Sequence, residues 1–292
     1  MMATLREILR YLRLNAFWRS SFRMRSIVAT KRSEDQPIYI SLSTTPERIA
    51  KIGPAIASLM DQAVMPDRIF LCIAKKSRKG QAYKIPGFLS GNPLVEIRWV
   101  EKDLGPATKW FYSCQTDDIE ERSSIIVLDD DQVYPKQLVE HYLHCRKQFP
   151  GAAFTLLGWP VPTTGRHTDR KCVSAGKVRI LGADDRIEVT ESPRQVHCMQ
   201  GASSYMITKG MLKPTADYFE KYKATNFADD ILISGLLADS QVPVYVLPGP
   251  FRFIRLHSLR MMRAPSLYNN TNRSSDYNDQ LYRLFEKSWP AV

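Results

Sequence analysis

The chain has 292 residues, of which 44% are hydrophobic and 24% charged. These values suit one large α/β domain or two small ones and exclude a globally disordered chain. The net charge of +11 comes without the interleaved aromatic and basic residues of RNA- and DNA-binding modules, so we expect no nucleic-acid partner. Five cysteines without a CxxC pair argue against a disulfide framework and indicate a reducing compartment.

A basic amphipathic helix is predicted over residues 4–18. Apolar side chains recur on one face and arginines surround them: Leu5, Ile8, Leu9, Leu12 and Phe17, with Arg6, Arg10, Arg13 and Arg19. Such a helix either lies on an anionic membrane surface or packs on the folded domain. Residues 31–36 are expected to be a flexible linker, so residues 1–36 form a separate segment. Without a stretch of ~20 apolar residues or the apolar region of a signal peptide, we expect a cytoplasmic protein, peripheral on the membrane if the helix binds lipid.

Strands and helices alternate along residues 37–150. Apolar runs predict strands at residues 37–43, 67–73, 95–100 and 124–128. Start signals at Pro46, Pro106 and Pro135 predict three helices, the first with Thr45 as its N-cap and an end near Met60. The alternation predicts an α/β fold with a mostly parallel central sheet and helices on both faces.

The second half of the chain is less regular. Residues 158–195 are rich in glycine, proline and charge, which suits an antiparallel excursion or an acceptor-binding loop. A strand is predicted from Gln200 to Ile207, then an acid-led helix over residues 228–237 and a strand over residues 242–247. We therefore expect one domain over residues 37–260 and a polar, mobile tail over residues 261–292.

Three consecutive aspartates, Asp129, Asp130 and Asp131, end the strand predicted at residues 124–128. The carboxyl ends of strands in open α/β sheets are where ligands bind. Three adjacent like charges repel one another, so the cluster suggests a divalent cation with hard oxygen ligands. The alternative is an acidic loop that caps the next helix.

Further motifs flank this cluster in a recognisable order. They are Ser43-Thr44-Thr45-Pro46-Glu47-Arg48, Asp103-Leu104-Gly105-Pro106-Ala107-Thr108-Lys109, the small-residue strand at Gly201 and the pair Asp229-Asp230. Together with the aspartates, over about residues 37–260, they resemble nucleotide-sugar-dependent glycosyltransferases of the GT-A fold, in the nucleotide-diphospho-sugar transferase superfamily. The similarity to the exostosin-like branch is faint. The resemblance implies a GT-A-like (Rossmann-like) fold.

The resemblance implies roles on the donor side. Asp129 and Asp131 would hold a divalent metal, Mn²⁺ or Mg²⁺, on the donor diphosphate, and Asp130 would bind the ribose or orient its neighbours. Arg48 and Lys109 would contact the diphosphate or nucleotide, and Asp103 the nucleotide. From the residues alone, Lys109 could equally be a solvent-exposed helix charge, and Asp103 could cap its own turn.

Roles on the acceptor side follow from the same resemblance. Asp230, with Asp229 as its partner, would act as the base that removes the acceptor proton in an inverting enzyme. In a retaining enzyme it would stabilise positive charge on the sugar or position the acceptor. A capping pair at a helix start is the alternative. His257 would add a third metal ligand, although a lone histidine is also common in structural roles.

The expected function is therefore transfer of a sugar from a nucleotide sugar, a UDP-sugar by family expectation, to a glycan or lipid-linked hydroxyl acceptor. Two other readings stay open. A nucleotidyltransferase also uses an acidic metal site, but it usually has a glycine-rich loop where this chain has Ser43–Arg48. A non-catalytic sugar- or nucleotide-binding protein of the same fold would keep the site without turnover.

Overall fold

The computed structural model describes residues 9–14, 16, 31–32, 36–179, 187–212, 228–254 and 275–291. Among them, no helix combines the length and the hydropathy needed to cross a membrane.

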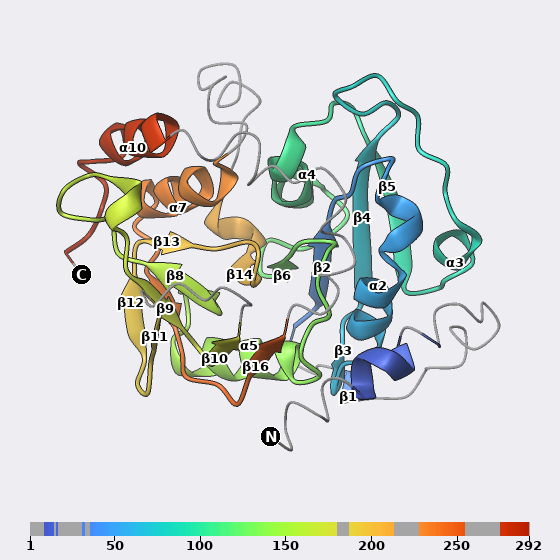
Figure 1. Cartoon of the computed structure of the whole chain (residues 1–292), viewed down its shortest axis with the longest axis horizontal. Helices are drawn as coiled ribbons and strands as arrows, with labels where there is room; N and C mark the ends of the chain where they lie inside the picture. The colour runs from blue at the N-terminus through green and yellow to red at the C-terminus, as the bar shows by residue number, and fades with distance from the viewer. Residues whose placement is uncertain are drawn as a thin grey trace.

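An eight-stranded mixed sheet forms the centre of the domain (Figure 1). Its strands, in spatial order, are β12 (Arg194–Val196), β15 (Val244–Val246), β7 (Ala153–Thr155), β14 (Tyr205–Thr208), β6 (Ser124–Val127), β2 (Ile38–Leu42), β4 (Arg68–Ala74) and β5 (Val95–Val100). The pairs β15–β7, β6–β2, β2–β4 and β4–β5 are parallel, whereas β14 is antiparallel to both neighbours and β12 to β15. The predicted mostly parallel sheet is confirmed.

Helices cover both faces of this sheet. The chain moves from β2 through α2 (Gly53–Met60) to β4, and then through α3 (Gly87–Ser90) to β5. It returns in the opposite direction through α4 (Thr108–Gln115) to β6, and α5 (Leu138–Gln148) follows. Because parallel crossovers are right-handed, α2 and α4 lie on opposite faces (Figure 1). Ser41 of β2 fixes α4 by donating a hydrogen bond to the Lys109 carbonyl at 2.6 Å.

The core lies between the sheet and these helices. All four residues of β6 are buried, and the side chains of Ile40, Phe70 and Ile126 are 0% exposed. A parallel strand covered on both faces is apolar along its whole length, which explains why residues 124–128 are so readily recognised in the sequence.

A smaller four-stranded sheet carries the predicted excursion. It consists of β11 (Ile187–Val189), β9 (Cys172–Ser174), β8 (Leu157–Trp159) and β13 (Cys198–Met199). β8 is antiparallel to both β9 and β13, so the antiparallel excursion is confirmed, and β11 pairs parallel with β9. A separate parallel pair joins β10 (Lys177–Arg179) to β16 (Arg252–Ile254). The chain leaves the main sheet after β7, returns to it briefly at the edge strand β12, passes through β13 of the smaller sheet and re-enters the main sheet at β14.

The first predicted helix does not begin at Pro46. Residues 46–48 form a turn, and a 3₁₀ segment, η2 (Ile49–Lys51), precedes α2. Thr45 accepts the backbone N–H groups of Arg48 and Ile49 through its carbonyl group and is the start of this turn. Pro54 explains the break, because it lacks an N–H and cannot donate a helical hydrogen bond to the carbonyl of Ala50 in the 3₁₀ segment.

The strand predicted from Gln200 begins only at Tyr205. The N–H groups of Ser203 and Ser204 bond back to the carbonyls of Gln200 and Gly201, which makes a turn. The linker prediction also fails in part, because β1 (Lys31–Arg32) pairs with β3 (Val64–Met65).

The expected mobile tail is partly a packed helix. α10 (Ser275–Leu284) contacts α7 (Asp229–Asp239), and Leu281, Tyr282 and Phe285 are each at most 3% exposed. The Trp159 indole in β8 donates to the Tyr282 hydroxyl at 2.8 Å, so α10 is also bonded to the smaller sheet. The apolar residues share one helix face, which the polar composition of the segment conceals. The expected boundary at residue 260 lies outside the described residues.

Replacing Gly235 with alanine is expected to weaken the packing of α10 on α7. A Cβ at this position would lie 2.2 Å from Phe285 Cδ2. Overpacking costs roughly 1–3 kcal/mol and the alanine gains ~1 kcal/mol of helix propensity. Because a contact of 2.2 Å is at the severe end of overpacking, we expect a net loss of up to about 2 kcal/mol in the free energy of unfolding. Urea unfolding measures it. Gly87→Ala, whose added Cβ meets no atom within 4 Å, is the control, and equal stability of the two variants would contradict this packing.

Candidate functional site

The aspartate triplet lies at the carboxyl end of β6, as predicted. Burial alternates along the loop that follows: Asp130, Gln132 and Tyr134 are buried, and the residues between them are partly exposed. The side chains of Asp129 and Asp131 are 35% and 33% exposed, whereas Asp130 is 4% exposed. The period of two therefore directs the two outer carboxylates toward solvent and the middle one into the protein.

Arg48 comes from the turn after β2 and reaches the triplet. Its Nη2 donates to Asp130 Oδ1 and lies 3.1 Å from Asp131 Oδ2. The Thr44 hydroxyl donates to the other Asp130 oxygen. Both oxygens of the buried carboxylate thus have partners, which is the condition for keeping a charge inside a protein. Asp130 anchors the loop to the end of β2.

Lys109 lies near the start of α4 and is 3% exposed. Its ammonium group forms an ion pair with Asp129 and lies 3.9 Å from Asp229 Oδ2. The alternative in which Lys109 is a solvent-exposed helix charge is wrong. The side chain joins the aspartate loop to the first turn of α7.

Asp229 and Asp230 open α7, where the helix dipole favours negative charge. Asp230 Oδ1 accepts the Gly201 N–H at 2.9 Å. A Cβ on Gly201 would lie 2.8 Å from this oxygen and 3.2 Å from Lys109 Nζ, so only glycine lets the backbone approach the carboxylate and the ammonium this closely. The run of small residues at 201–204 is the sequence signal for this approach.

Negative charge exceeds positive charge among these groups, since five carboxyl groups surround Lys109 and Arg48. Burial raises the pKa of Asp130 to about 6, despite Arg48, and the neighbouring aspartates add to the rise. Burial also raises the pKa of Asp229, and it raises that of Asp230 well above the ordinary value, with Asp229 as the next cause. For Lys109, burial lowers the pKa, but Asp129 and the α7 pair outweigh it and the net shift is upward. The site can therefore accept further positive charge.

The predicted donor residue Asp103 is held by backbone groups of its own turn and of the segment after β4. Its two oxygens accept the backbone N–H groups of Gly105 at 2.8 Å and Arg78 at 2.9 Å, and Gly105 has a φ of +65°. The bond from Gly105 is that of the turn-capping alternative. A contact with a nucleotide stays a prediction for Asp103. His257 lies outside the described residues, so its metal role also stays a prediction.

The donor set fits a cation that substrate helps to hold. Asp129 and Asp131 offer hard oxygen ligands and are partly exposed. Within the described ranges, no three His, Cys, Asp or Glu side chains group as a metal cage. Mg²⁺ in particular is commonly bound by one or two carboxylates, with substrate phosphates and water completing the shell. The residues therefore suit such a shared site rather than a closed protein cage.

Two further residues of the site escape the sequence patterns. Thr44 holds Asp130, and the buried Tyr134 hydroxyl contacts the backbone of Asp129, accepting its N–H at 2.9 Å and donating to its carbonyl at 2.8 Å. Thr44 lies far from Asp130 in the sequence, so no local pattern shows their contact. Tyr134 is only five residues from Asp129, but their contact depends on how the loop that contains both residues folds back.

No protein-family model and no curated protein sequence matches the chain. Among solved structures, similarity extends to the Francisella tularensis 2-C-methyl-D-erythritol 4-phosphate cytidylyltransferase (IspD), with 11% identity, a TM-score of 0.37, and coverage of 74% of this chain and 89% of that chain. A 4-diphosphocytidyl-2C-methyl-D-erythritol synthase shares 12% identity with a TM-score of 0.43, and the match covers 80% of this chain and 95% of that chain. GalNAc-T7, solved with UDP, GalNAc and Mn²⁺, shares 11% identity with a TM-score of 0.45, and the match covers 84% of this chain and 50% of that chain. Similarity at this level leaves the function to be argued from the chain's own residues.

The stability that the Asp130 carboxyl contributes is expected to fall as pH rises from about 4 to about 6. Its folded-state pKa of about 6 lies above the ordinary 3.8, so in this window the folded protein keeps a proton that the unfolded chain has lost. The contribution is full below the unfolded pKa and is lost as pH passes the folded one. Urea unfolding of the unmodified protein and of Asp130→Asn, across this window and in chelator, measures the difference. A difference that stays constant or grows with pH would contradict the assignment.

Proposed function

We propose that the chain is a metal-dependent glycosyltransferase that moves a sugar from a nucleotide-diphosphate donor, with UDP-sugars as the first candidates, to a hydroxyl acceptor. One observation carries the proposal. Five aspartates, Arg48 and Lys109 converge at the carboxyl end of β6 from segments that are far apart in the sequence. This is the edge of an α/β sheet where ligands bind.

On the donor side, the residues supply both signs of charge that a bound diphosphate needs. Arg48 and Lys109 are cations that can contact phosphate oxygens, and each is already held in place by a carboxylate. Asp129 and Asp131 would hold the metal, which would neutralise charge on the leaving nucleotide diphosphate. Asp130, with both oxygens satisfied, keeps the loop in place between them.

On the acceptor side, Asp230 has the properties of a proton acceptor. In the transfer, the acceptor oxygen forms a bond to the anomeric carbon, the bond from that carbon to the diphosphate breaks, and the acceptor proton must go to a base. Asp230 is oriented by the Gly201 N–H, and its pKa is raised by burial and by Asp229, which makes its carboxylate a stronger base. In a retaining reaction the same carboxylate would position the acceptor instead.

A donor panel tests the proposal directly. Nucleotide sugars, together with CTP as a probe for nucleotidyl transfer, are screened for binding and slow hydrolysis with Mn²⁺, with Mg²⁺ and with chelator. We expect metal-dependent binding of one nucleotide sugar, lost in Asp131→Ala and kept in Asp117→Ala, an exposed aspartate before β6. Asp230→Asn keeps the oxygen that accepts from Gly201 and should retain donor binding while transfer falls by roughly 10²–10⁴-fold.

The other outcomes of this panel are informative as well. Turnover of CTP without use of any nucleotide sugar would identify a nucleotidyltransferase. Donor binding without hydrolysis or transfer to any hydroxyl acceptor would identify a binding protein of the same fold. Absence of binding under every metal condition would contradict the proposal and leave the triplet as a capping loop.

Peripheral contact with an anionic membrane is proposed as part of the same function, because it would bring the site to a lipid-linked acceptor. The described part of the amino-terminal helix, residues 9–14, leaves Leu9 and Leu12 exposed at 56% and 54%. The Arg13 side chain beside them is 68% exposed. Exposed leucines next to arginine are the features of a helix that lies in a membrane interface.

Flotation with phosphatidylserine-containing vesicles tests the membrane contact. The double variant Leu9→Ser/Leu12→Ser is expected to lose flotation, because it removes apolar area that would enter the lipid. Leu284→Ser, which changes a leucine that is 43% exposed on α10, should float like the unmodified protein. Equal flotation of all three proteins, or none, would contradict a lipid-binding role for these leucines.

A further inference from the structure

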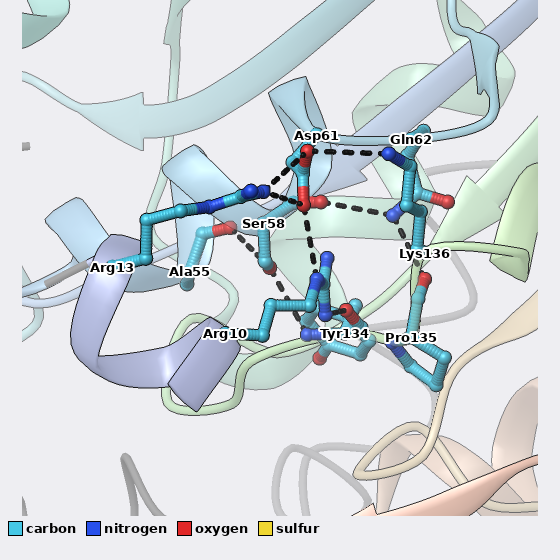
Figure 2. Close-up of polar contacts among 9 residues, drawn as sticks. All are labelled: Arg10, Arg13, Ala55, Ser58, Asp61, Gln62, Tyr134, Pro135 and Lys136. Atoms are coloured by element: carbon cyan, nitrogen blue, oxygen red, sulfur yellow. Dashed lines mark hydrogen bonds and ion pairs between the residues drawn. The ribbon is translucent and has the colours of Figure 1, made fainter. Parts of the chain in front are cut away.

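The described helix at residues 9–14 docks on the domain through a polar cluster beneath the aspartate loop (Figure 2). Tyr11 and Leu14 are buried, and the Arg10 side chain is 10% exposed. The docking face is therefore different from the leucine face that the sequence pattern emphasises. Packing on the domain, one of the two roles predicted for this helix, is confirmed for these residues.

Asp61, at the end of α2, is the centre of this cluster. Its carboxylate accepts from Arg10 Nε at 3.0 Å and from Arg13 Nη2 at 3.3 Å, and Lys136 Nζ lies 3.7 Å away. The Asp61 side chain is 11% exposed, so the pair with Arg10 is shielded from solvent on both sides. Such a pair is screened little by salt and holds its geometry well.

Arg10 also reaches the loop that carries the aspartates. Its Nη1 donates to the Tyr134 carbonyl at 2.7 Å, while the Tyr134 N–H donates to Ser58 Oγ at 3.0 Å (Figure 2). The ring of Tyr134 is 1% exposed, and its hydroxyl holds the backbone N–H and carbonyl of Asp129. One residue thus joins the amino-terminal helix, α2 and the first aspartate.

A second side chain fixes the same loop from α2. Gln62 Nε2 donates to the Pro135 carbonyl at 2.9 Å, and its Oε1 accepts the Val139 N–H at 3.2 Å. The loop between β6 and α5 is thus fixed at Pro135 by Gln62, next to the contacts that Tyr134 makes with Arg10, Ser58 and Asp129. The contact from Arg10 therefore acts on the part of the loop that is bonded directly to Asp129.

We propose that Arg10 and Tyr134 are positioning residues of the candidate donor site: the amino-terminal helix, through Arg10 and the buried Tyr134, sets the backbone position of Asp129. The link to donor and metal binding rests on the proposed function, whereas the link to the loop does not. Residues behind a metal ligand fix its orientation, and their loss typically costs 10–100-fold in metal affinity.

The test compares Arg10→Gln, Tyr134→Phe and the matched control Arg13→Gln in the full chain. Arg13 is on the same helix and has the same acceptor, Asp61, but its side chain is mostly exposed. Hydrogen–deuterium exchange of peptides over residues 128–136 reports the loop, and Mn²⁺ titration reports the ligands. We expect several-fold faster exchange confined to this loop and about tenfold weaker Mn²⁺ binding for Arg10→Gln and Tyr134→Phe, with neither change for Arg13→Gln.

The two readouts separate the two proposals. If the unmodified protein binds no Mn²⁺ and no donor, the proposed function fails, and the exchange data alone decide the positioning role. Faster exchange spread equally over β2 and α5 would show a general loss of stability and would overturn the positioning role. Tyr134→Phe removes only the hydroxyl and keeps the backbone contacts of residue 134. Unchanged loop exchange in this variant would also overturn the positioning role. If Arg10→Gln does not fold, Tyr134→Phe decides the question from the other end of the link.

Discussion

The ion pair between the buried Lys109 and the partly exposed Asp129 is the constraint on which the site depends. Lys109 is fixed on α4, Asp129 follows β6, and the same ammonium group faces the start of α7. Because the Lys109 ammonium is buried, removing its carboxylate partners would leave a charge that is not compensated. The positions of α4, the β6 loop and α7 are therefore coupled through electrostatics, although these elements come from different parts of the chain.

Arg48 and Lys109 pair with different aspartates of the site. Arg48 neutralises the buried Asp130 and touches Asp131, while Lys109 serves Asp129 and the α7 pair. Two cations cannot balance five carboxyl groups. Burial raises the pKa values of Asp130, Asp229 and Asp230, and the neighbouring aspartates add to the rise. Such an excess of carboxyl groups at a ligand-binding edge suits the binding of a divalent cation with hard oxygen ligands.

How much of this could be read from the sequence depends on the range of each interaction. The strands through β6 and the helix at residue 229 have strong local signals. The roles proposed for the aspartates, Lys109 and Asp230 come from the resemblance in the order of the motifs. The roles of Thr44 and Gly201 depend on contacts across the fold, and so do the contacts of Tyr134 with Arg10 and Ser58, which no local pattern encodes. The same holds for the amino-terminal helix: its periodicity identifies the exposed leucines, whereas Arg10 docks it through partners at Asp61 and Tyr134.

The position of β14 has a consequence for how the chain folds. β14 lies between β6 and β7, yet it is reached only after the smaller sheet has been traversed, with β7 ending at Thr155 and β14 beginning at Tyr205. Until then, the facing edges of two apolar strands stay unpaired, and unpaired edges are templates for association with other chains. Pairings of such long sequence separation are slow to form. Completion of the central sheet is thus a late step in folding. A nascent chain that ends before residue 208 would expose an incomplete sheet with unpaired strand edges, which is prone to aggregate.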